Sequence, residues 1–266
     1  MDTTYQQQLA VVTGGSSGIG LELAKQFADH GFDLLIVSDT AKVFAAAEEL
    51  RRRGAKVDAI QADLATYGGV EALCRRIDSL ARPVDAIAIN AGVGVGGPFT
   101  ETELEAELNL IQLNVVSVVH LAKRVVRGMV GRGEGRILFT ASIAAEMPGP
   151  FEAVYAASKA FVLSFAEALR NELKDSGVTV TALQPGATET NFFHRAGMED
   201  TRVGAGKKSD PADVAREGFE ALMEGKDHVV SAMMKEKIQV FTGQVVPEKV
   251  KAEQHRKLSE PGSASA

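Results

Sequence analysis

The chain has 266 residues, 45% of them hydrophobic and 24% charged, which suits one large α/β domain with a substantial core. Its net charge of −6, from 29 Lys and Arg against 35 Asp and Glu, gives no electrostatic reason to expect nucleic acid or a membrane surface as a partner. The first residues lack the apolar stretch of a signal peptide, and no apolar run could span a bilayer. Because Cys74 is the single cysteine, no intrachain disulfide can form, and we expect a cytoplasmic protein.

Seven short β-rich runs alternate with longer amphipathic segments along most of the chain. Most of these runs are almost continuously apolar, as expected for parallel strands buried on both faces. The predicted strands are Leu9–Thr13, Leu34–Ser38, Val57–Gln61, Ala86–Asn90, Arg136–Ala141, Val178–Gln184 and His228–Ser231.

The segments between these strands have the apolar spacing of helices. Strands and helices that alternate in this way imply right-handed crossovers, so we predict a single-domain, Rossmann-like, doubly wound parallel sheet with helices on both faces. The predicted helices are Ile19–His30, Ala41–Arg53, Tyr67–Leu80, Glu101–Val130, Phe151–Asp175 and Pro211–Glu224.

No internal repeat or linker divides this pattern, so we expect one domain over residues 1–231. Residues 187–209 have little periodicity and lie between a strand and a helix, and we interpret them as a flap. Residues 232–266 form a C-terminal extension, predicted to be partly helical with a frayed end.

A glycine-rich turn follows the first predicted strand and opens the first predicted helix. Its glycines stand in a G-x-x-x-G-x-G spacing, which permits positive φ and close approach of the backbone to a diphosphate. The free N–H groups at the helix start would then face the anion. A tight structural turn is the alternative, but the strand before and the helix after favour nucleotide binding. The expected contacts are Gly14, Ser16, Ser17, Gly18, Ile19 and Gly20.

Two later strands also end in residues suited to a nucleotide, at the edge where ligands of open α/β sheets bind. Asp63 and Leu64 close the third strand and are expected at the adenine. Asn90, Ala91 and Gly92 close the fourth, where small residues permit close approach of a ribose. Each signal alone fits an ordinary turn, and it is their repetition at successive strand ends that indicates binding.

A third group of residues has the chemistry of an acid/base site. Ser142 ends the fifth strand, and Tyr155 and Lys159 lie one helical turn apart, so that both project from one helix face. An adjacent ammonium, together with the positive ring of an oxidised nicotinamide, would favour the phenolate and lower the pKa of the tyrosine from its usual value of about 10. Ser142 would hold the substrate oxygen while Tyr155 takes or gives its proton. By itself, the Tyr–Lys pair also fits a half-buried helix face.

In their order and intervals these motifs resemble the short-chain dehydrogenase/reductase family over about Leu9–Ser231. The resemblance implies that Asn114 completes a catalytic tetrad by holding a water in a proton relay. It also implies that Pro185 and Gly186 shape the nicotinamide site, that Thr190 bonds the cofactor, and that Lys159 touches the nicotinamide ribose. The family's helix pairing implies a homodimer or homotetramer. The C-terminal extension lies outside the region that the resemblance explains.

The resulting prediction is an enzyme that moves a hydride between NAD(P) and an alcohol or ketone. We expect a largely apolar small substrate and no catalytic metal, since the five histidines lack ligand spacing. Two alternatives stay open: a dinucleotide-sensing protein without turnover, and an epimerase or dehydratase on the same scaffold. The expected substrate contacts are Ala144, Met147, Phe151, Phe192 and Phe193.

The sequence favours NAD(H) over NADP(H) as the cofactor. Asp39 ends the second strand, 19 residues beyond Gly20, where an acid can bind the ribose hydroxyls and repel a 2′-phosphate. Ser17 stands where NADP-using relatives often have a basic residue. The acid is one position later than in most NAD-using relatives, however, with Ser38 in the usual place. The alternative is therefore NADP(H), with Lys42 meeting the phosphate.

Overall fold

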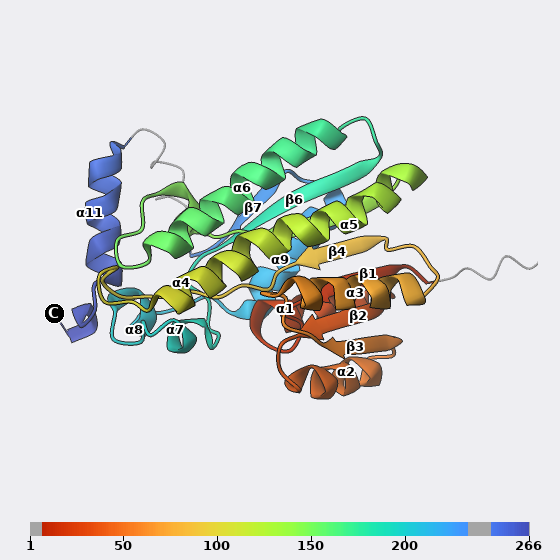
Figure 1. Cartoon of the computed structure of the whole chain (residues 1–266), viewed down its shortest axis with the longest axis horizontal. Coiled ribbons are helices and arrows are strands. Elements are labelled where there is room, and N and C mark those ends of the chain that lie inside the picture. The colour runs from red at the N-terminus through yellow and green to blue at the C-terminus, as the bar shows by residue number, and fades with distance from the viewer. Residues whose placement is uncertain (1–6, 234–245, 266) are drawn as a thin grey trace, which may run out of the picture.

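A computed structural model describes residues 7–233 and 246–265 of the chain. Seven parallel strands form one sheet in the order β3-β2-β1-β4-β5-β6-β7 (Figure 1), which confirms the predicted doubly wound architecture. The chain order reverses between β1 and β4, so a crevice opens at the carboxyl ends of these central strands. The strands are β1 (Leu9–Thr13), β2 (Asp33–Ser38), β3 (Val57–Gln61), β4 (Ala86–Ile89), β5 (Gly135–Thr140), β6 (Val178–Pro185) and β7 (His228–Ser231).

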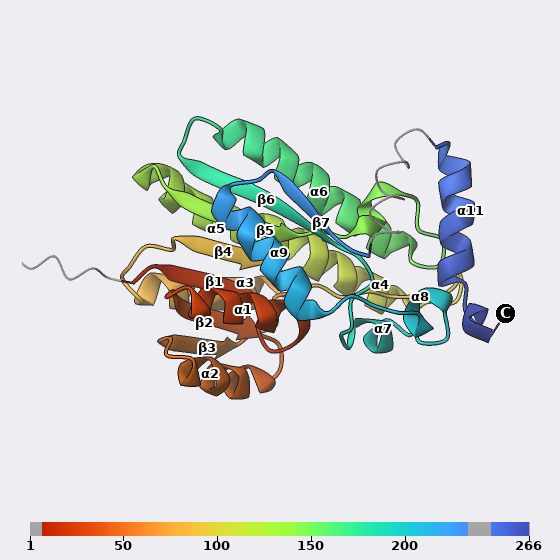
Figure 2. The ribbon, with the colours of Figure 1, turned by 180° about the vertical axis from the view of Figure 1, so that it is seen from behind.

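Helices cover both faces of the sheet. Helices α3, α5 and α6 lie over the face seen in Figure 1, and α1, α2 and α9 lie over the opposite face, seen in Figure 2. The helices are α1 (Gly18–Asp29), α2 (Lys42–Arg52), α3 (Tyr67–Ser79), α4 (Leu104–Ile111), α5 (Ser117–Arg132), α6 (Ala153–Leu173), α7 (Phe192–Arg195), α8 (Arg202–Ala205), α9 (Pro211–Glu224) and α11 (Glu248–Ser259).

Successive residues of a central strand supply two separate cores. In β1, Val11 packs beneath α3, α5 and α6, whereas Ala10 and Val12 pack beneath α1, α2 and α9, and none of the three is exposed. Each buried aliphatic side chain contributes about 1.5–3 kcal/mol to folding. This burial on both faces is why the strands are almost continuously apolar in sequence.

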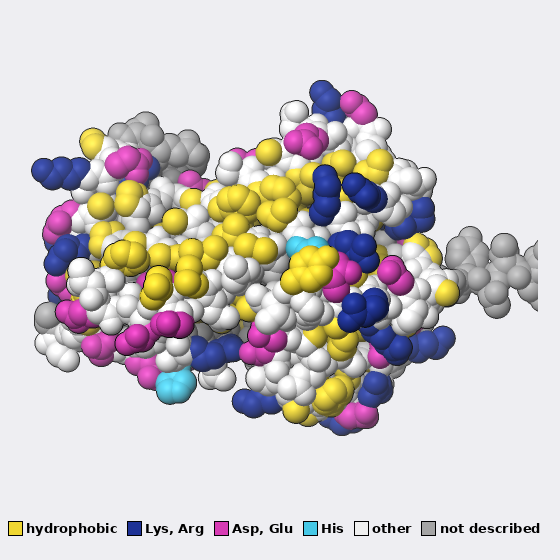
Figure 3. Space-filling view, viewed as in Figure 1, with side chains coloured by type: hydrophobic (Ala, Val, Ile, Leu, Met, Phe, Trp, Pro, Cys, Tyr) yellow, Lys and Arg dark blue, Asp and Glu magenta, His cyan; other side chains and the backbone are white. Residues whose placement is uncertain are grey.

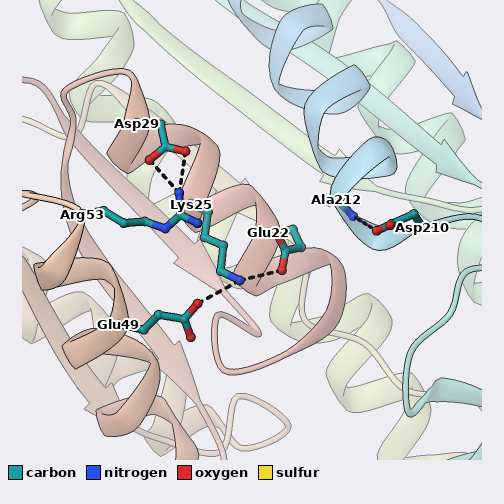
Figure 4. Close-up of polar contacts among 7 residues, drawn as sticks. All are labelled: Glu22, Lys25, Asp29, Glu49, Arg53, Asp210 and Ala212. Carbon is teal, nitrogen blue, oxygen red and sulfur yellow. Dashed lines mark hydrogen bonds and ion pairs between the residues drawn. The ribbon is translucent and has the colours of Figure 1, made fainter.

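Polar contacts fix the helices on the second face (Figure 4). Lys25 Nζ lies 2.8 Å from Glu22 Oε1 and 3.0 Å from Glu49 Oε1, and Arg53 Nη1 donates to both oxygens of Asp29 at 2.9 and 2.7 Å. Exposed pairs of this kind add little stability, about 0–1 kcal/mol each. They join the second half of α2 and the residue after it to α1. The same view shows Asp210 capping α9 through the backbone N–H of Ala212, at 2.8 Å.

Two predicted helices differ from those observed by more than one residue at an end. The segment predicted as one helix over Glu101–Val130 is divided into α4 and α5 by a π-turn, Gln112–Val116. The predicted helix Phe151–Asp175 begins only at Ala153, because Phe151 has a φ of +66°, outside the right-handed helical region.

The C-terminal extension returns to the carboxyl end of the sheet (Figure 1). Its described part contains α11 and a short 3-10 turn, Ser263–Ser265, while residues 234–245 and 266 lie outside the described residues. The end predicted to fray contacts the predicted flap instead: the Ser263 hydroxyl accepts from Arg202 N at 3.0 Å, and Gly262 N donates to Asp200 at 2.8 Å. None of the described helices is long and apolar enough to cross a membrane.

Candidate active site

One cavity of about 510 Å³ lies at the carboxyl ends of the strands and brings most of the predicted site residues together. Asn114 and Phe151 are the two predicted site residues that do not line it. The predicted residues that line it are Gly14, Ser16, Ser17, Gly18, Ile19, Gly20, Asp39, Asp63, Leu64, Asn90, Ala91, Gly92, Ser142, Ala144, Met147, Tyr155, Lys159, Pro185, Gly186, Thr190, Phe192 and Phe193.

The glycine turn at one end of the cavity has no room for side chains. Gly14 and Gly18 have φ values of +69° and +54°, and a Cβ added at Gly20 would lie 2.2 Å from the Gly14 carbonyl oxygen. Helix α1 begins at Gly18 without a side-chain cap from Ser17, so its first N–H groups are available to an anion. The turn therefore fits the diphosphate of a dinucleotide.

A chain of hydrogen bonds connects this turn to the catalytic side of the cavity. The Thr13 hydroxyl accepts from the backbone N–H of Asn90 at 2.8 Å, and Asn90 Nδ2 donates to the Thr13 carbonyl at 3.1 Å. The Thr140 hydroxyl donates to Asn90 Oδ1 at 3.1 Å, and Lys159 Nζ donates to the Thr140 carbonyl at 2.9 Å. The ends of β1, β4 and β5 are thereby joined to α6.

Tyr155 and Lys159 project from one face of α6 into the cavity, as predicted from their spacing. Lys159 Nζ lies 5.8 Å from the centroid of the Tyr155 ring, and the two residues are only 5% and 9% exposed, respectively. The Ser142 hydroxyl lies near enough to the Tyr155 phenol to lower the pKa of the phenol, and it accepts from the backbone N–H of Ala144 at 3.1 Å. The three side chains expected to perform acid/base chemistry are thus gathered at one place.

Burial dominates the ionisation of both residues. It raises the pKa of Tyr155, an effect that the hydrogen bond from Ser142 opposes and the Glu152 carboxylate reinforces. Burial lowers the pKa of Lys159 to about 8. The protein's own groups therefore keep Tyr155 protonated near neutral pH, whereas the sequence led us to expect that the ammonium would favour the phenolate.

Asn114 lies in the π-turn, behind the cavity wall. Its Nδ2 donates to the Val93 carbonyl at 2.9 Å and its Oδ1 accepts from Val93 N at 3.0 Å. A Cβ added at Gly92 would lie 3.1 Å from Asn114 Oδ1 and 3.3 Å from Lys159 Nζ, so both groups border Gly92. Asn114 is thus next to the lysine but has no direct access to a ligand.

The end of the cavity beside Tyr155, where we expect the substrate, is walled largely by apolar side chains. The Phe192 ring lies 5.1 Å from the ring of Tyr155, centroid to centroid. Phe151 does not belong to this wall, because its ring lies against the guanidinium of Arg256, 4.9 Å from it. The structure therefore gives no support to Phe151 as a substrate contact.

Sequence reasoning missed a polar group at this end. Glu152 lines the cavity together with His255, Leu258 and Ser259 of α11. Glu152 and His255 are 103 positions apart, and nothing in the sequence indicates that α11 folds back onto the start of α6. In the described ranges 7–233 and 246–265, no three His, Cys, Asp or Glu side chains are grouped as metal ligands.

Comparison with known proteins identifies the family. A sequence model described as short chain dehydrogenase matches residues 8–200, and the chain therefore belongs to the short-chain dehydrogenase family. The chain is 30% identical over 240 residues to the oxidoreductase YmfI of Bacillus subtilis, covering 89% of this chain and 95% of that one. It is 36% identical over 222 residues to 1-deoxy-11-beta-hydroxypentalenate dehydrogenase of Streptomyces exfoliatus, covering 82% and 80%.

Solved structures agree with this assignment. A short-chain dehydrogenase from Sphingobium yanoikuyae in complex with NADPH superposes with a TM-score of 0.80 at 30% identity, covering 89% of this chain and 93% of that one. A 3-ketoacyl-(acyl-carrier-protein) reductase from Brucella melitensis complexed with NADH gives 0.73 at 28% identity, covering 84% and 96%. The predicted NAD(P)-dependent oxidoreductase acting on CH–OH groups is thus confirmed at the level of the family.

Gly20→Ala tests whether the glycine turn binds the cofactor. The added methyl would overlap the Gly14 carbonyl, so the turn must shift, and we expect the dissociation constant of the dinucleotide to rise at least tenfold. Titration calorimetry measures this directly. Gly131→Ala is the control, since a Cβ there meets no atom within 4 Å, and it should bind like the wild type. Equal affinity in both variants would contradict a role for the turn.

Proposed function

We propose that Tyr155 is the acid/base of this oxidoreductase and that Ser142, Lys159 and Asn114 assist it. The observation that supports this assignment is that the glycine turn, Ser142, Tyr155 and Lys159 line a single cavity. A dinucleotide lying along that cavity would bring its nicotinamide to the end that holds the tyrosine. The reaction is the interconversion of an alcohol and a ketone.

Each of these groups has a distinct task in the proposed mechanism. The Ser142 hydroxyl donates its one proton to the substrate oxygen and holds that oxygen beside Tyr155. In reduction Tyr155 donates its proton to that oxygen, and in oxidation it accepts one. Lys159 supplies positive charge nearby and binds the ribose, and Asn114 holds a relay water beside the lysine. The bound nicotinamide supplies or receives the hydride.

Replacement of Tyr155 by Phe removes the proton donor and little else. Turnover of a ketone should fall by about 10²–10⁴-fold, while cofactor affinity and melting temperature stay close to wild type. Steady-state kinetics with the reduced cofactor measure the loss. Tyr67→Phe is the matched control, because Tyr67 is 76% exposed and does not line the cavity. Retention of more than about a tenth of wild-type turnover would rule out the acid/base role.

The same assay separates the two alternative functions. A dinucleotide sensor would bind the cofactor without consuming it. An epimerase or dehydratase would convert its substrate with no net change in absorbance of the reduced cofactor. The buried Ser142, Tyr155 and Lys159 argue against a sensor, because binding alone does not require a desolvated acid beside a lysine.

Ketone reduction should also depend on pH through Lys159. Tyr155, with its raised pKa, remains protonated across the range, whereas Lys159 loses its proton as the pH rises through about 8. We therefore expect kcat/KM to be level from about pH 6 to 7.5 and to fall above about pH 8. The kinetic isotope effect on kcat/KM with a deuterated cofactor shows whether hydride transfer limits the measured rate. A rate that climbs through pH 8 would contradict this assignment.

We propose NAD(H) as the preferred cofactor. Asp39 lines the cavity at the β2 end, and its carboxylate accepts from the Ser38 hydroxyl at 3.0 Å. Among the described lining residues the cations are Lys159, beside Tyr155, and Arg195, in α7, and neither comes from the β2 end. Lys42, the group that would favour NADP(H), is exposed and does not line the cavity.

Asp39→Ala tests this preference. Wild type should have the higher kcat/KM with NADH, and the variant should shift the NADH/NADPH ratio toward NADPH by at least tenfold, because a carboxylate that repels the 2′-phosphate is removed. Asp78→Ala, which removes a carboxylate that is 74% exposed on α3, should leave the ratio unchanged. A wild-type preference for NADPH would contradict the assignment.

The substrate is proposed to enter beneath residues 187–209. The ends of this segment are tied by a bridge between Thr188 and Ser209, and its short helix α7 carries two aromatic residues of the cavity wall. A segment held at both ends and lying over the cavity is suited to close on a bound substrate.

We retain the cytoplasm as the proposed location, since the buried, unpaired thiol of Cys74 suits a reducing compartment.

We propose that the enzyme is a homodimer or a tetramer of dimers. Apolar side chains gather over α4, α5 and α6 on the face shown in Figure 3. Leu104, Leu108 and Phe161 are 65%, 51% and 40% exposed there. A shallow apolar groove on the same helices adds to this surface. An exposed patch of this kind is typical of a subunit interface.

Leu108→Glu should weaken that interface. A charge placed in the centre of an apolar contact is costly to desolvate, so sedimentation should show a shift toward monomer at micromolar concentration. Phe44→Glu, a similar change at a residue that is 49% exposed on α2, should keep the wild-type oligomeric state. An unchanged sedimentation coefficient for Leu108→Glu would place the interface elsewhere.

A further inference from the structure

The C-terminal helix α11 closes the substrate end of the cavity with a buried polar cluster. His255 Nε2 donates to Glu152 Oε1 at 2.8 Å, and the Ser259 hydroxyl donates to the same oxygen at 2.8 Å. Glu152, His255 and Ser259 are 7%, 8% and 2% exposed. All three residues line the cavity that contains Tyr155. An acidic side chain from one part of the chain is thus held at the substrate end by two donors from another.

The position of the carboxylate is not explained by local structure. Glu152 is the N-cap residue of α6, where an acidic side chain normally accepts from the first N–H groups, yet its side chain makes no capping bond. Both of its hydrogen bonds use Oε1. Within the described part of the chain, no donor is hydrogen-bonded to Oε2. One carboxylate oxygen therefore remains able to accept a hydrogen bond inside the cavity.

Attachment of α11 alone does not require such a cluster. A buried carboxylate is costly to desolvate, and an apolar pair of similar size commonly stabilises a helix contact as well or better. The neighbouring wall is indeed apolar, with Ala144, Met147, Phe192 and Leu258 around the same space. Glu152 is a hydrogen-bond acceptor that is costly to bury, and it lies in an apolar pocket, three positions before Tyr155 in the sequence. These are the features of a group that recognises a ligand.

We propose that Glu152, held in place by His255 and Ser259, is a specificity-determining residue that accepts a hydrogen bond from a donor group on the substrate. The preferred substrates are then ketones or alcohols that carry a second, hydrogen-bond-donating group, a hydroxyl or an ammonium, at a distance from the reacting carbon. Hydrocarbon ketones leave Oε2 of Glu152 without a donor, and substrates with an anionic group at that end are repelled. This inference rests on the proposed function of the cavity.

Binding to the complete enzyme with its cofactor tests this role without turnover. In a Tyr155→Phe background, titration calorimetry compares a methyl ketone with two analogues of equal chain length, one bearing a terminal hydroxyl and the other a terminal ammonium. A hydrogen bond to a charged acceptor is worth about 1.5–3 kcal/mol, so at least one analogue should bind about tenfold or more tightly than the plain ketone. Which analogue is preferred distinguishes a neutral donor from a cation.

Glu152→Gln in the same background should reduce this preference to less than about threefold, because the carboxamide is a weaker acceptor and has no charge. Glu253→Gln, the same change at an exposed residue of α11, should leave the preference unchanged. Circular dichroism and melting temperature show whether α11 remains folded in each variant.

Two results would overturn the proposal: equal binding of all three ligands to the enzyme with Glu152 intact, and a preference that survives in Glu152→Gln. The first comparison needs no substitution at Glu152, so it decides the matter even if that variant fails to fold. Because binding is measured without catalysis, a failure of the acid/base assignment would appear in the kinetics of Tyr155→Phe and would leave this result intact.

Discussion

Asn90 is hydrogen-bonded on both sides, to β1 through the Thr13 carbonyl and to β5 through the Thr140 hydroxyl. Through the Thr140 carbonyl the chain of bonds continues to Lys159, so the glycine turn and the catalytic helix share one polar network. Buried polar groups of this kind must remain paired, which makes the network resistant to small displacements. The distance from the glycine turn to Lys159 is therefore fixed by the sheet, since each member of the network belongs to a strand end or touches one.

The π-turn between α4 and α5 extends this arrangement to Asn114. A π-turn interrupts the regular helical bonding, and such turns commonly occur at functional sites. Here the Asn114 amide pairs with both the N–H and the carbonyl of Val93, as a neighbouring strand would. Both backbone groups of Val93, in the loop after β4, are thereby satisfied. A local irregularity in the helix thus stabilises the loop that borders Lys159.

The sequence predicted the sheet well because each strand is buried on both faces, and β1, β3 and β7 have the predicted limits. It also predicted the glycine turn and the Ser142, Tyr155 and Lys159 group, since these depend on spacing within one element or on order along the chain. It could not predict the break at the π-turn, where apolar periodicity continues, or the positive φ of Phe151. The contact between Glu152 and α11 could not be predicted from the sequence either, because it depends on how the C-terminal extension folds back onto the sheet.

Burial favours the uncharged form of both Tyr155 and Lys159, because desolvation disfavours the phenolate and the ammonium alike. The lysine, with a pKa of about 8, still carries its proton at neutral pH, and so does the tyrosine. The negative charge of Glu152 reinforces this state by raising the pKa of Tyr155 further. The protein's own groups thus prepare a proton donor, which is the form that ketone reduction requires, and formation of the phenolate for alcohol oxidation requires additional positive charge beside the ring. Glu152, which we propose recognises the substrate, thus also favours the protonated form of Tyr155, the proposed proton donor.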